Sequence, residues 1–403
     1  MSMRKIEVLP TERLRASPSF VLAFTMDGRP YIAKETEPYI QFWLSERYRA
    51  LLSMFSGRHG ATVGDALDSA LRLSNRVQDP AERQRLMAAV RDMREAGVLV
   101  STREDTSRYD ARIVQAYVTH RPFPRELSDQ IIRDGAIGPA SRVLDLAGGP
   151  GDLALALARA SGDVTLMELS KGFVSAARRR AKEAALNLTV VHESCNRLVF
   201  NDDAYDVITV SQALHWLDDV MVCRGICRVL RRGGSFFVVH ANFDVDEGHP
   251  LSFVLGRRSV LGHQPEAAFA DLVQALLRRL TLLFDALDSP QVHRIDPAQH
   301  WSATGGPALI VPARASLFRQ RRPLGPGFLR GFLTERHIDA SGMTPEAFWA
   351  EVETRCAGAS ARALEGRFDW AVLQFTRGGP RAELGPLGEL PVTEIGFDGP
   401  AQP

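Results

Sequence analysis

The chain has 403 residues, of which 45% are hydrophobic and 24% charged, and its formal net charge is +1. This composition supplies full cores for two or three domains, and the balanced charge argues against a nucleic-acid or polybasic membrane-binding protein. No apolar run approaches the roughly 20 residues that span a bilayer, and we see no signal-peptide pattern. Four cysteines are too few for a disulfide framework, so we expect a cytoplasmic protein with buried thiols.

The first unit, residues 1–105, is predicted to be a winged-helix-like domain. Residues 19–34 alternate as two strands around the turn Met26-Asp27-Gly28, and residues 39–55 show helical spacing of apolar side chains. Two further helices follow, the first capped by Thr62 and the second ended by Gly97, and a short strand closes the unit.

Residues 106–140 are predicted to be a helical connector, and residues 141–241 alternate between strands and helices. Links this short require a mostly parallel sheet with helices on both faces. Residues 242–365 contain amphipathic helices, which we interpret as a substrate lid, and residues 366–380 form a final strand before a tail at 381–403. For the basic run FRQRR inside the lid, we expect a solvated charged face rather than contact with an acidic substrate.

A glycine-rich turn interrupts this alternating region directly after its first strand. The strand ends at Asp145 and Leu146, and AGGPGD leads into an Ala/Leu-rich helix. The turn fits a dinucleotide pattern, G-x-G-x-x-A, but a carboxylate at Asp145 favours a ligand that carries positive charge. Glu168, which ends the next strand, suits ribose hydroxyls in either kind of ligand. The turn alone therefore leaves both ligand classes open.

The segments around this turn resemble a known family. The stretch ESCNRLVFNDDAYDVITVSQALHWLDD, followed by CRVLRRGG and preceded by THRPFPREL, is similar to class I S-adenosylmethionine-dependent methyltransferases, in particular the branch with ALHW and RVLrpGG motifs. The resemblance covers residues 117–241. It implies an α/β fold with a seven-stranded, mostly parallel Rossmann-like sheet and S-adenosylmethionine as the cofactor.

The resemblance also implies roles for individual residues. Glu168 would bind the ribose hydroxyls, with Leu169 beside the adenine. Ala147 stands where the family has its first glycine, and an alanine at this position is expected to have a negative φ. The segment expected at the adenine edge lacks the acid that the family usually has there. The remaining implied contacts are Asp145, Ala147, Gly148, Gly149 and Gly151 at the methionine end, Ser194, Cys195 and Asn196 at the adenine edge, and Ser211, Gln212 and Ala213 under the sulfonium.

Two histidines are candidate catalytic bases. His215 follows the cofactor floor, although the pair His215-Trp216 is also typical of structural packing. His240 ends the fifth strand, at the edge where open α/β sheets bind ligands. We expect no metal site, and a carboxylate acceptor would need no base at neutral pH.

The N-terminal unit is similar to two kinds of domain. Small-molecule O-methyltransferases carry a dimerising winged helix, whereas the leading hairpin is similar to PqqD-like domains, in which a peptide adds as a strand. The sequence therefore predicts a methyltransferase that O-methylates a natural-product intermediate, either a small molecule or a modified peptide. The N-terminal unit would either join two copies into a homodimer or bind a peptide. The alternative is a non-catalytic protein that binds a cofactor or a peptide in regulation.

Overall fold

The fold is given by a computed structural model. It describes residues 10, 13–17, 20–24, 30–34, 41–43, 45–55, 60–73, 76, 79–95, 98–101, 111–120, 123–195, 198–214, 217, 219–255, 269–287, 310–333, 338 and 343–396.

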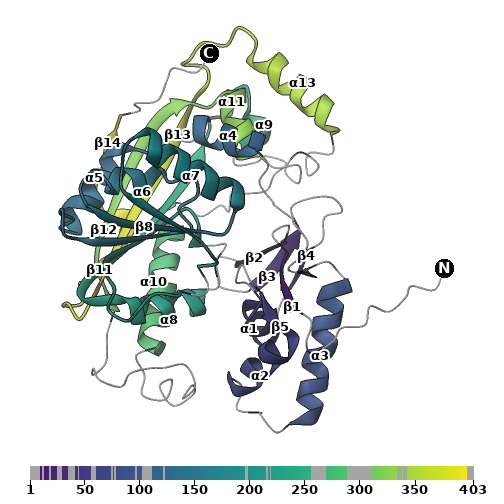
Figure 1. Cartoon of the computed structure of the whole chain (residues 1–403). Coiled ribbons are helices and arrows are strands. Elements are labelled where there is room, and N and C mark those ends of the chain that lie inside the picture. The colour runs from purple at the N-terminus through teal and green to yellow at the C-terminus, as the bar shows by residue number, and fades with distance from the viewer. Residues whose placement is uncertain are drawn as a thin grey trace.

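An eight-stranded sheet forms the centre of residues 142–395 (Figure 1). Its strands lie in the order β14-β12-β13-β11-β10-β7-β8-β9. All neighbours are parallel except β13, which is antiparallel to both β11 and β12. The bounds are β7 (Arg142–Leu146), β8 (Asp163–Glu168), β9 (Leu188–His192), β10 (Tyr205–Ser211), β11 (Leu230–Asp244), β12 (Ile310–Pro323), β13 (Glu365–Arg377) and β14 (Val392–Ile395).

The prediction of seven strands is corrected by this sheet. The eighth strand, β14, lies in the segment expected to be a tail, and it pairs in parallel with β12 from Leu317↔Val392 to Gln320↔Ile395. A second contact holds the end of this segment, because Gln320 Nε2 donates to the carbonyl of Gly396 over 2.6 Å. The segment is therefore an integral edge of the sheet.

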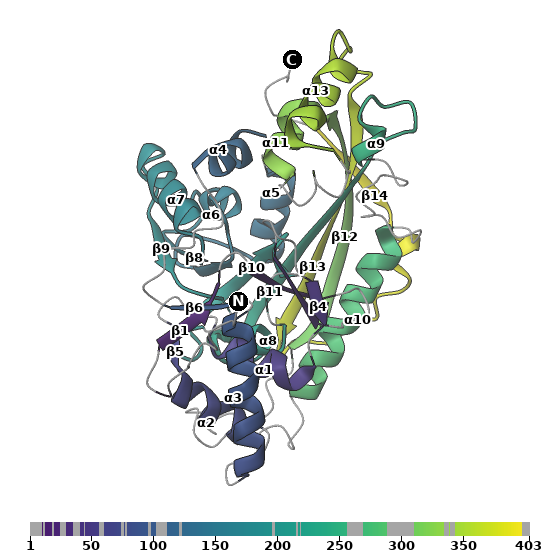
Figure 2. The ribbon, with the colours of Figure 1, turned by 90° about the vertical axis from the view of Figure 1, so that its right-hand side faces the viewer.

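Helices cover both faces of the sheet. On one face α5 (Arg125–Asp134), α6 (Asp152–Leu157) and α7 (Lys171–Glu183) bury their apolar sides in one core cluster. On the other face α8 (Asp219–Val229) and α10 (Phe269–Leu287) form a second cluster. Beyond the carboxyl ends of the parallel strands lie α4 (Ala111–His120), α9 (Ser252–Leu255), α11 (Pro326–Phe332) and α13 (Pro345–Cys356), toward which the long strands β11, β12 and β13 extend (Figure 2).

The expected helical lid over residues 242–365 is also corrected. This region contains β12, a 14-residue strand, as well as helices. Its longest helix, α10, packs Leu277, Leu280 and Phe284 against the sheet. Strand β12 was not predicted because Arg319 and Arg321 interrupt its apolar pattern. In the structure these two arginines pair with Asp369 and Glu365 of the neighbouring strand β13.

The N-terminal unit has its own core. Three helices, α1 (Glu46–Ser53), α2 (Val63–Leu73) and α3 (Pro80–Glu95), pack beside a sheet of order β5-β1-β6. A second sheet has the order β2-β3-β4. The six strands are β1 (Arg13–Ala16), β2 (Phe20–Phe24), β3 (Pro30–Lys34), β4 (Gln41–Trp43), β5 (Ala61–Thr62) and β6 (Leu99–Ser101). Outside this unit, a short 3-10 helix, η2 (Leu387–Glu389), precedes β14.

Local predictions in this unit are confirmed in part. Strands β2 and β3 pair antiparallel, as the predicted hairpin requires, and Thr62 Oγ1 accepts the amide of Asp65 over 3.1 Å, as a helix cap should. The helix expected from residue 39 begins only at Glu46. Ser45 caps it by accepting the amide of Tyr48, and β4 precedes the cap.

Candidate functional site

A cleft of about 120 Å³ opens at the glycine turn. Parts of β7, β10, β11, β12 and β13 meet there with α4, beyond the carboxyl ends of the parallel strands, which is where open α/β sheets place ligands. The residues that line it are Tyr117, Phe123, Asp145, Ala147, Gly148, Gly149, Pro150, Asp152, Leu153, Ser211, Gln212, Ala241, Phe243, Arg322, Phe368 and Trp370.

Asp145 is a fully buried carboxylate at the base of this cleft. Its Oδ1 accepts a 2.6 Å hydrogen bond from Thr209, its neighbour on β10, while its Oδ2 has no hydrogen-bond partner among the described residues. Burial raises the pKa of Asp145 to about 7. The Thr209 bond and the backbone amide of Ala154 oppose the rise, and the charges of Glu168 and Asp152 add to it. A ligand cation would satisfy the second oxygen and favour its ionised form.

The glycines of the turn serve different needs. A side chain at Gly148 would collide with Asp145 Oδ2 and approach Leu166 Cδ1 to 2.9 Å, so this position has room only for glycine. Gly149 has a φ of +57°, and a Cβ there would meet no described atom within 4 Å. Gly151, with a φ of +88°, precedes α6. Gly149 therefore leaves space in which a ligand can approach the backbone.

Ala147 corrects one expectation, because its φ is +51° rather than negative. Left-handed backbone costs a non-glycine residue about 1–2 kcal/mol, so the surrounding structure must hold it. Its amide donates to Cys195 Sγ over 3.1 Å, and that thiol contacts the carbonyl of Met167 at 3.6 Å. Burial strongly raises the pKa of the Cys195 thiol. Cys195 thus acts as a neutral anchor for the turn.

Arg180 of α7 is a further anchor, which the sequence analysis did not find. Its guanidinium donates to the carbonyl of Pro150 over 2.9 Å and to Asp152 over 2.6 Å, and so ties α7 to the glycine turn. Arg180 lies about 30 residues from these partners in the chain, and its position in an otherwise basic helix gives no sign of this role.

Glu168 lies opposite the glycine turn at the end of β8. Its carboxylate accepts the amide of Gly149 over 3.0 Å and that of Ser170 over 2.7 Å. The next residue, Leu169, exposes 39% of its surface, which is unusual for a leucine beside a buried strand end and offers an apolar surface to a planar ring. Neither Glu168 nor Leu169 lines the described cleft, so they would serve the part of a ligand beyond it.

The segment after β9 was expected to line the adenine edge. Ser194 and Cys195 are both buried, and Asn196 lies outside the described residues. An acid, Glu193, directly precedes this segment. Its Oε1 accepts the amide of Ser194 over 2.8 Å.

At the end of β10, Ser211 and Gln212 line the cleft, whereas Ala213 packs into the core cluster on the other face of the sheet. Gln212 has a φ of +55°, and its amide donates to the carbonyl of Val239 over 2.9 Å. Its Nε2 is buried without a hydrogen-bond partner among the described residues. The strained backbone therefore holds an unsatisfied donor beside the glycine turn.

Of the two candidate bases, the structure describes only His240. His215 lies outside the described residues, as do His300 and His337. His240 stacks on Phe269 of α10 at 6.1 Å, while its chain neighbour Ala241 lines the cleft. Burial lowers the pKa of His240 to about 4. Because adjacent residues of a strand face opposite ways, the side chain of His240 lies on the other face of the sheet from that of Ala241.

The far wall of the cleft was not predicted. Phe243 of β11, Phe368 and Trp370 of β13 and Arg322 of β12 share one face of the sheet, with ring centroids of Phe368 and Trp370 6.0 Å apart and those of Phe243 and Phe368 5.6 Å apart. Trp370 Nε1 is buried without a hydrogen-bond partner among the described residues. The cleft thus joins a polar end to an aromatic end.

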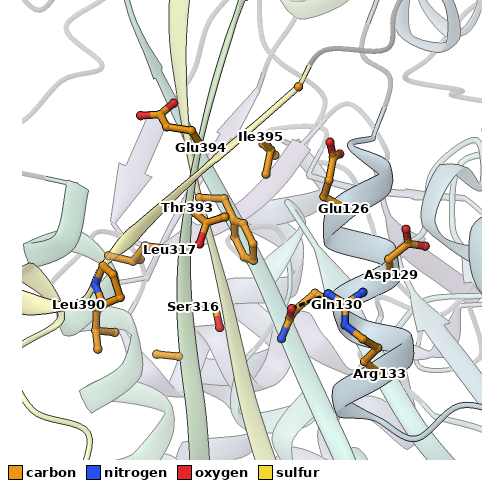
Figure 3. A pocket seen from close by; sticks show the side chains of 14 residues that line it. Glu126, Asp129, Gln130, Arg133, Ser316, Leu317, Leu390, Thr393, Glu394 and Ile395 are labelled. Carbon is orange, nitrogen blue, oxygen red and sulfur yellow. Dashed lines mark hydrogen bonds between the residues drawn. The ribbon is translucent and has the colours of Figure 1, made fainter.

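A larger cavity, about 530 Å³, lies between α5 and the strands β12 and β14. Figure 3 shows side chains of α5, including Glu126, Gln130 and Arg133, on one side of it and those of Ser316 and Thr393 on the other. None of the residues proposed from the sequence lines it. We assign the site to the smaller cleft because it contains the glycine turn and buried polar atoms of Asp145 and Gln212 that have no hydrogen-bond partner among the described residues.

Two further features were sought among the described residues. Within these ranges no helix is both long and apolar enough to cross a membrane. The same residues contain no group of three or more histidine, cysteine, aspartate or glutamate side chains arranged to hold a metal ion.

Comparison with known proteins bears on the middle of the chain. Residues 143–234 match the family model of a methyltransferase domain. The chain is 34% identical over 122 residues to the ubiquinone/menaquinone biosynthesis C-methyltransferase UbiE of Vibrio parahaemolyticus, covering 29% of this chain and 46% of that protein. It is 30% identical over 140 residues to UbiE of Proteus mirabilis, covering 33% and 54%. The chain thus spans about half the length of these curated relatives.

Solved structures give weaker similarities. The YcgJ protein of Bacillus subtilis aligns with 63% of this chain and 99% of its own at 17% identity, with a TM-score of 0.38. Geranyl diphosphate C-methyltransferase of Streptomyces coelicolor, solved with geranyl diphosphate and S-adenosylhomocysteine, covers 62% of this chain and 78% of its own at 14% identity, with a TM-score of 0.35. Similarity at this level carries no functional argument, whereas the strand order and the domain match fit a Rossmann-like methyltransferase fold.

Proposed function

We propose that the protein is an S-adenosylmethionine-dependent methyltransferase whose cofactor binds at the glycine turn. The observation that carries the proposal is Asp145, a buried carboxylate with one unsatisfied oxygen at the base of a cleft, inside a matched methyltransferase domain. A cofactor with a sulfonium and an ammonium group supplies the positive charge that this oxygen needs. A dinucleotide would bring phosphates, which a buried carboxylate repels.

The residues present fit this cofactor along its length. Asp145 and the open backbone at Gly149 would hold the methionine end, and Glu168 would accept the ribose hydroxyls. Leu169 would pack against the adenine. Bound there, the cofactor would supply a methyl group on a positively charged sulfur. A nucleophile would bond to the methyl carbon in line as the carbon–sulfur bond breaks, and S-adenosylhomocysteine would leave.

The chain's own residues would then align the nucleophile and exclude water. Alignment at about 3 Å is worth several kcal/mol of the barrier, and the closely packed rings of Phe123 and Trp370, 5.8 Å apart, leave little room for solvent. Gln212 Nε2 would donate to the acceptor group at the reacting end. The described residues that line the cleft include no histidine, so a carboxylate oxygen, which needs no deprotonation, fits as the acceptor.

We infer that the acceptor is an oxygen of a natural-product intermediate, a small molecule or a modified peptide. The curated relatives are C-methyltransferases by name, so carbon is the competing acceptor atom. The N-terminal unit, with its three-stranded sheet β2-β3-β4, would bind a peptide by strand addition or join two copies into a homodimer. A non-catalytic cofactor-binding protein is the competing function.

Parallel titrations test the cofactor assignment. We expect isothermal titration to show micromolar binding of S-adenosylmethionine and S-adenosylhomocysteine and no binding of NAD. Gly149→Arg should remove this binding, because the new side chain would fill the open space at the turn. Gly233→Arg is the matched control, with a φ of +74° and an equally open Cβ position at the start of β11. Binding of NAD alone would return the turn to the dinucleotide class.

Turnover separates the enzyme from a binding protein. Transfer of a labelled methyl group from S-adenosylmethionine to candidate acceptors, followed by hydrolysis of the product with mild base, distinguishes esters from ethers and C-methyl products. Tight cofactor binding without transfer to any acceptor would favour the non-catalytic function.

A further inference from the structure

Thr209 and Asp145 form a polar pair in an otherwise apolar row of the sheet. The strand register places Thr209 of β10 beside Asp145 of β7. The row continues to Leu166 on β8 and to Phe237 on β11, and all four side chains are fully buried. A valine, which is β-branched like threonine, would fill the space of Thr209 in this row. Packing alone therefore does not account for the hydroxyl.

The hydroxyl of Thr209 bonds one oxygen of the Asp145 carboxylate. Thr209 Oγ1 donates to Asp145 Oδ1 over 2.6 Å. The other oxygen, Oδ2, has no hydrogen-bond partner among the described residues, and a Cβ placed on Gly148 would collide with it. Gly148 in turn lines the cleft. The carboxylate is thus held at one oxygen inside the sheet, while its second oxygen lies against the glycine turn.

The orientation of this carboxylate depends on the Thr209 bond. The terminal torsion of an aspartate has a broad, weakly defined minimum, so packing alone does not fix the direction of the two oxygens. On the other side of Asp145 in the row, Leu166 has no side-chain donor that could hold it. Hydrogen bonds to charged groups are the stronger kind, and they favour the charged form. Thr209 therefore both directs Oδ2 and supports the ionised carboxylate.

We propose that Thr209 is a positioning residue for cofactor binding: its hydroxyl holds Asp145 so that Oδ2 faces the cation of the bound cofactor. Thr209 is not among the described residues that line the cleft, so it acts through the carboxylate and does not contact the ligand. The inference rests on the proposed function, because the cation is taken to be that of S-adenosylmethionine.

The groups around Asp145 make its charge sensitive to this bond. Burial raises the pKa of Asp145 to about 7, the Thr209 bond is the largest effect that opposes the rise, and the charges of Glu168 on β8 and Asp152 on α6 add to it. Cys195, after β9, is a neutral thiol because burial strongly raises its pKa. Loss of the Thr209 bond should raise the pKa of Asp145 further. Cofactor affinity, which increases as the carboxylate ionises, should then level off at a higher pH than in the wild type.

Two ligands test this role in the full-length protein. S-adenosylmethionine carries the ammonium and the sulfonium, whereas 5′-methylthioadenosine has the same adenosine and neither cation. Both would be titrated calorimetrically from about pH 6 to about pH 9, a range that spans the ionisation of Asp145. For Thr209→Val we expect a loss of about tenfold in affinity for S-adenosylmethionine at pH 7, as expected when a hydrogen bond to a charged group is removed. Affinity for 5′-methylthioadenosine should stay within about twofold of wild type.

Matched variants separate the hydroxyl from packing. Thr209→Ser keeps the hydroxyl and should restore most of the affinity and the pH profile. Thr165→Val is the control on the neighbouring strand β8, because Thr165 is also buried and its hydroxyl bonds Tyr205 instead. It should leave both ligands and the pH profile unchanged. Where Thr209→Val does not fold, Thr209→Cys replaces it, and its weak donor should give a smaller loss in the same direction.

Three results would overturn the positioning role. They are a wild-type affinity and pH profile in Thr209→Val, equal losses for the two ligands, and a loss in Thr209→Ser as large as that in Thr209→Val. The failure of the proposed function looks different. In that case the wild-type protein itself binds no S-adenosylmethionine at any pH.

Discussion

The two ends of the cleft are built in different ways. At the glycine turn, the critical groups lie within one short stretch after β7, and they are held under strain: Ala147 has a positive φ and Asp145 is buried without full hydrogen bonding. At the aromatic wall, Phe243, Phe368 and Arg322 come from three strands far apart in the chain and pack with ordinary backbone geometry. A short motif thus builds the end that we propose binds the cofactor, and strand pairing builds the other end.

This difference suggests that stability and cofactor affinity are separable across the cleft. Loss of packing at the wall should reduce stability and leave cofactor affinity unchanged, whereas changes at the turn should affect both. The following predictions are ordered from the largest expected effect to the smallest.

Phe368→Ala tests the wall. Phe368 is 6% exposed and contacts Phe243, Trp370 and Arg322, so its removal should lower the free energy of unfolding by about 3–5 kcal/mol. Below the unfolding transition, the affinity for S-adenosylhomocysteine should remain within about twofold of wild type. Urea unfolding and calorimetric titration measure the two quantities.

Leu166→Ala is its partner at the turn. Leu166 is fully buried on β8, and its Cδ1 lies 3.4 Å from the position of a Cβ at Gly151. A cavity there should cost about 2–5 kcal/mol of stability and also weaken cofactor binding, because the glycine turn rests on this side chain. If Phe368→Ala weakens the cofactor as much as Leu166→Ala does, the two ends of the cleft are not separable.

Asp145→Asn should raise the free energy of unfolding at pH 8 and lower the affinity for the cofactor. In the folded protein the pKa of Asp145 is raised from 3.8 to about 7, so the folded state binds this proton more tightly than the unfolded chain. Stability therefore falls as pH rises from about 4 to 7 and stays lower above that, by up to about 4 kcal/mol. The amide should recover part of this at pH 8 and lose about 100-fold in cofactor affinity. Lower stability of the variant at pH 8 would contradict the burial cost of Asp145.

The same carboxylate predicts a pH dependence of binding. Its protonation below about pH 7 removes the charge that faces the cofactor's cation, so affinity for S-adenosylmethionine should fall up to tenfold per pH unit there and level off above pH 8. In Asp145→Asn the slope should be absent. A wild-type slope in that variant would place the titrating group elsewhere.

The glycine turn could be predicted from the sequence, whereas the aromatic wall could not. Asp145, Gly149 and Glu168 lie at strand ends and turns that local patterns define, and they lie together as expected. Arg322 and Trp370 were missed because their meeting depends on the pairing of β12 with β13, which no local pattern specifies.

The orientation of His240 could not be predicted for a different reason. Residues 236–239 are apolar on both faces of β11, so the alternation that would show which side chains face the cleft is absent from the sequence. Only the packing of α10 shows that His240 faces away. The positive φ of Ala147 was likewise hidden, because a bond to Cys195, 48 residues away, holds the turn in that conformation.

The smallest expected effect concerns strain at the turn. Ala147→Gly relieves a left-handed conformation worth about 1–2 kcal/mol, but glycine loses about 0.5–1 kcal/mol more backbone entropy on folding. We therefore expect a net gain of about 0.5–1 kcal/mol in the free energy of unfolding, measured by urea denaturation. Ala185→Gly is the matched control, since Ala185 is exposed after α7 with a φ of +52°. Both variants should gain similar stability, and only Ala147→Gly should change cofactor affinity, because only Ala147 lines the cleft. Unchanged affinity in both would mean that the strain at Ala147 serves the fold of the turn and contributes nothing to binding.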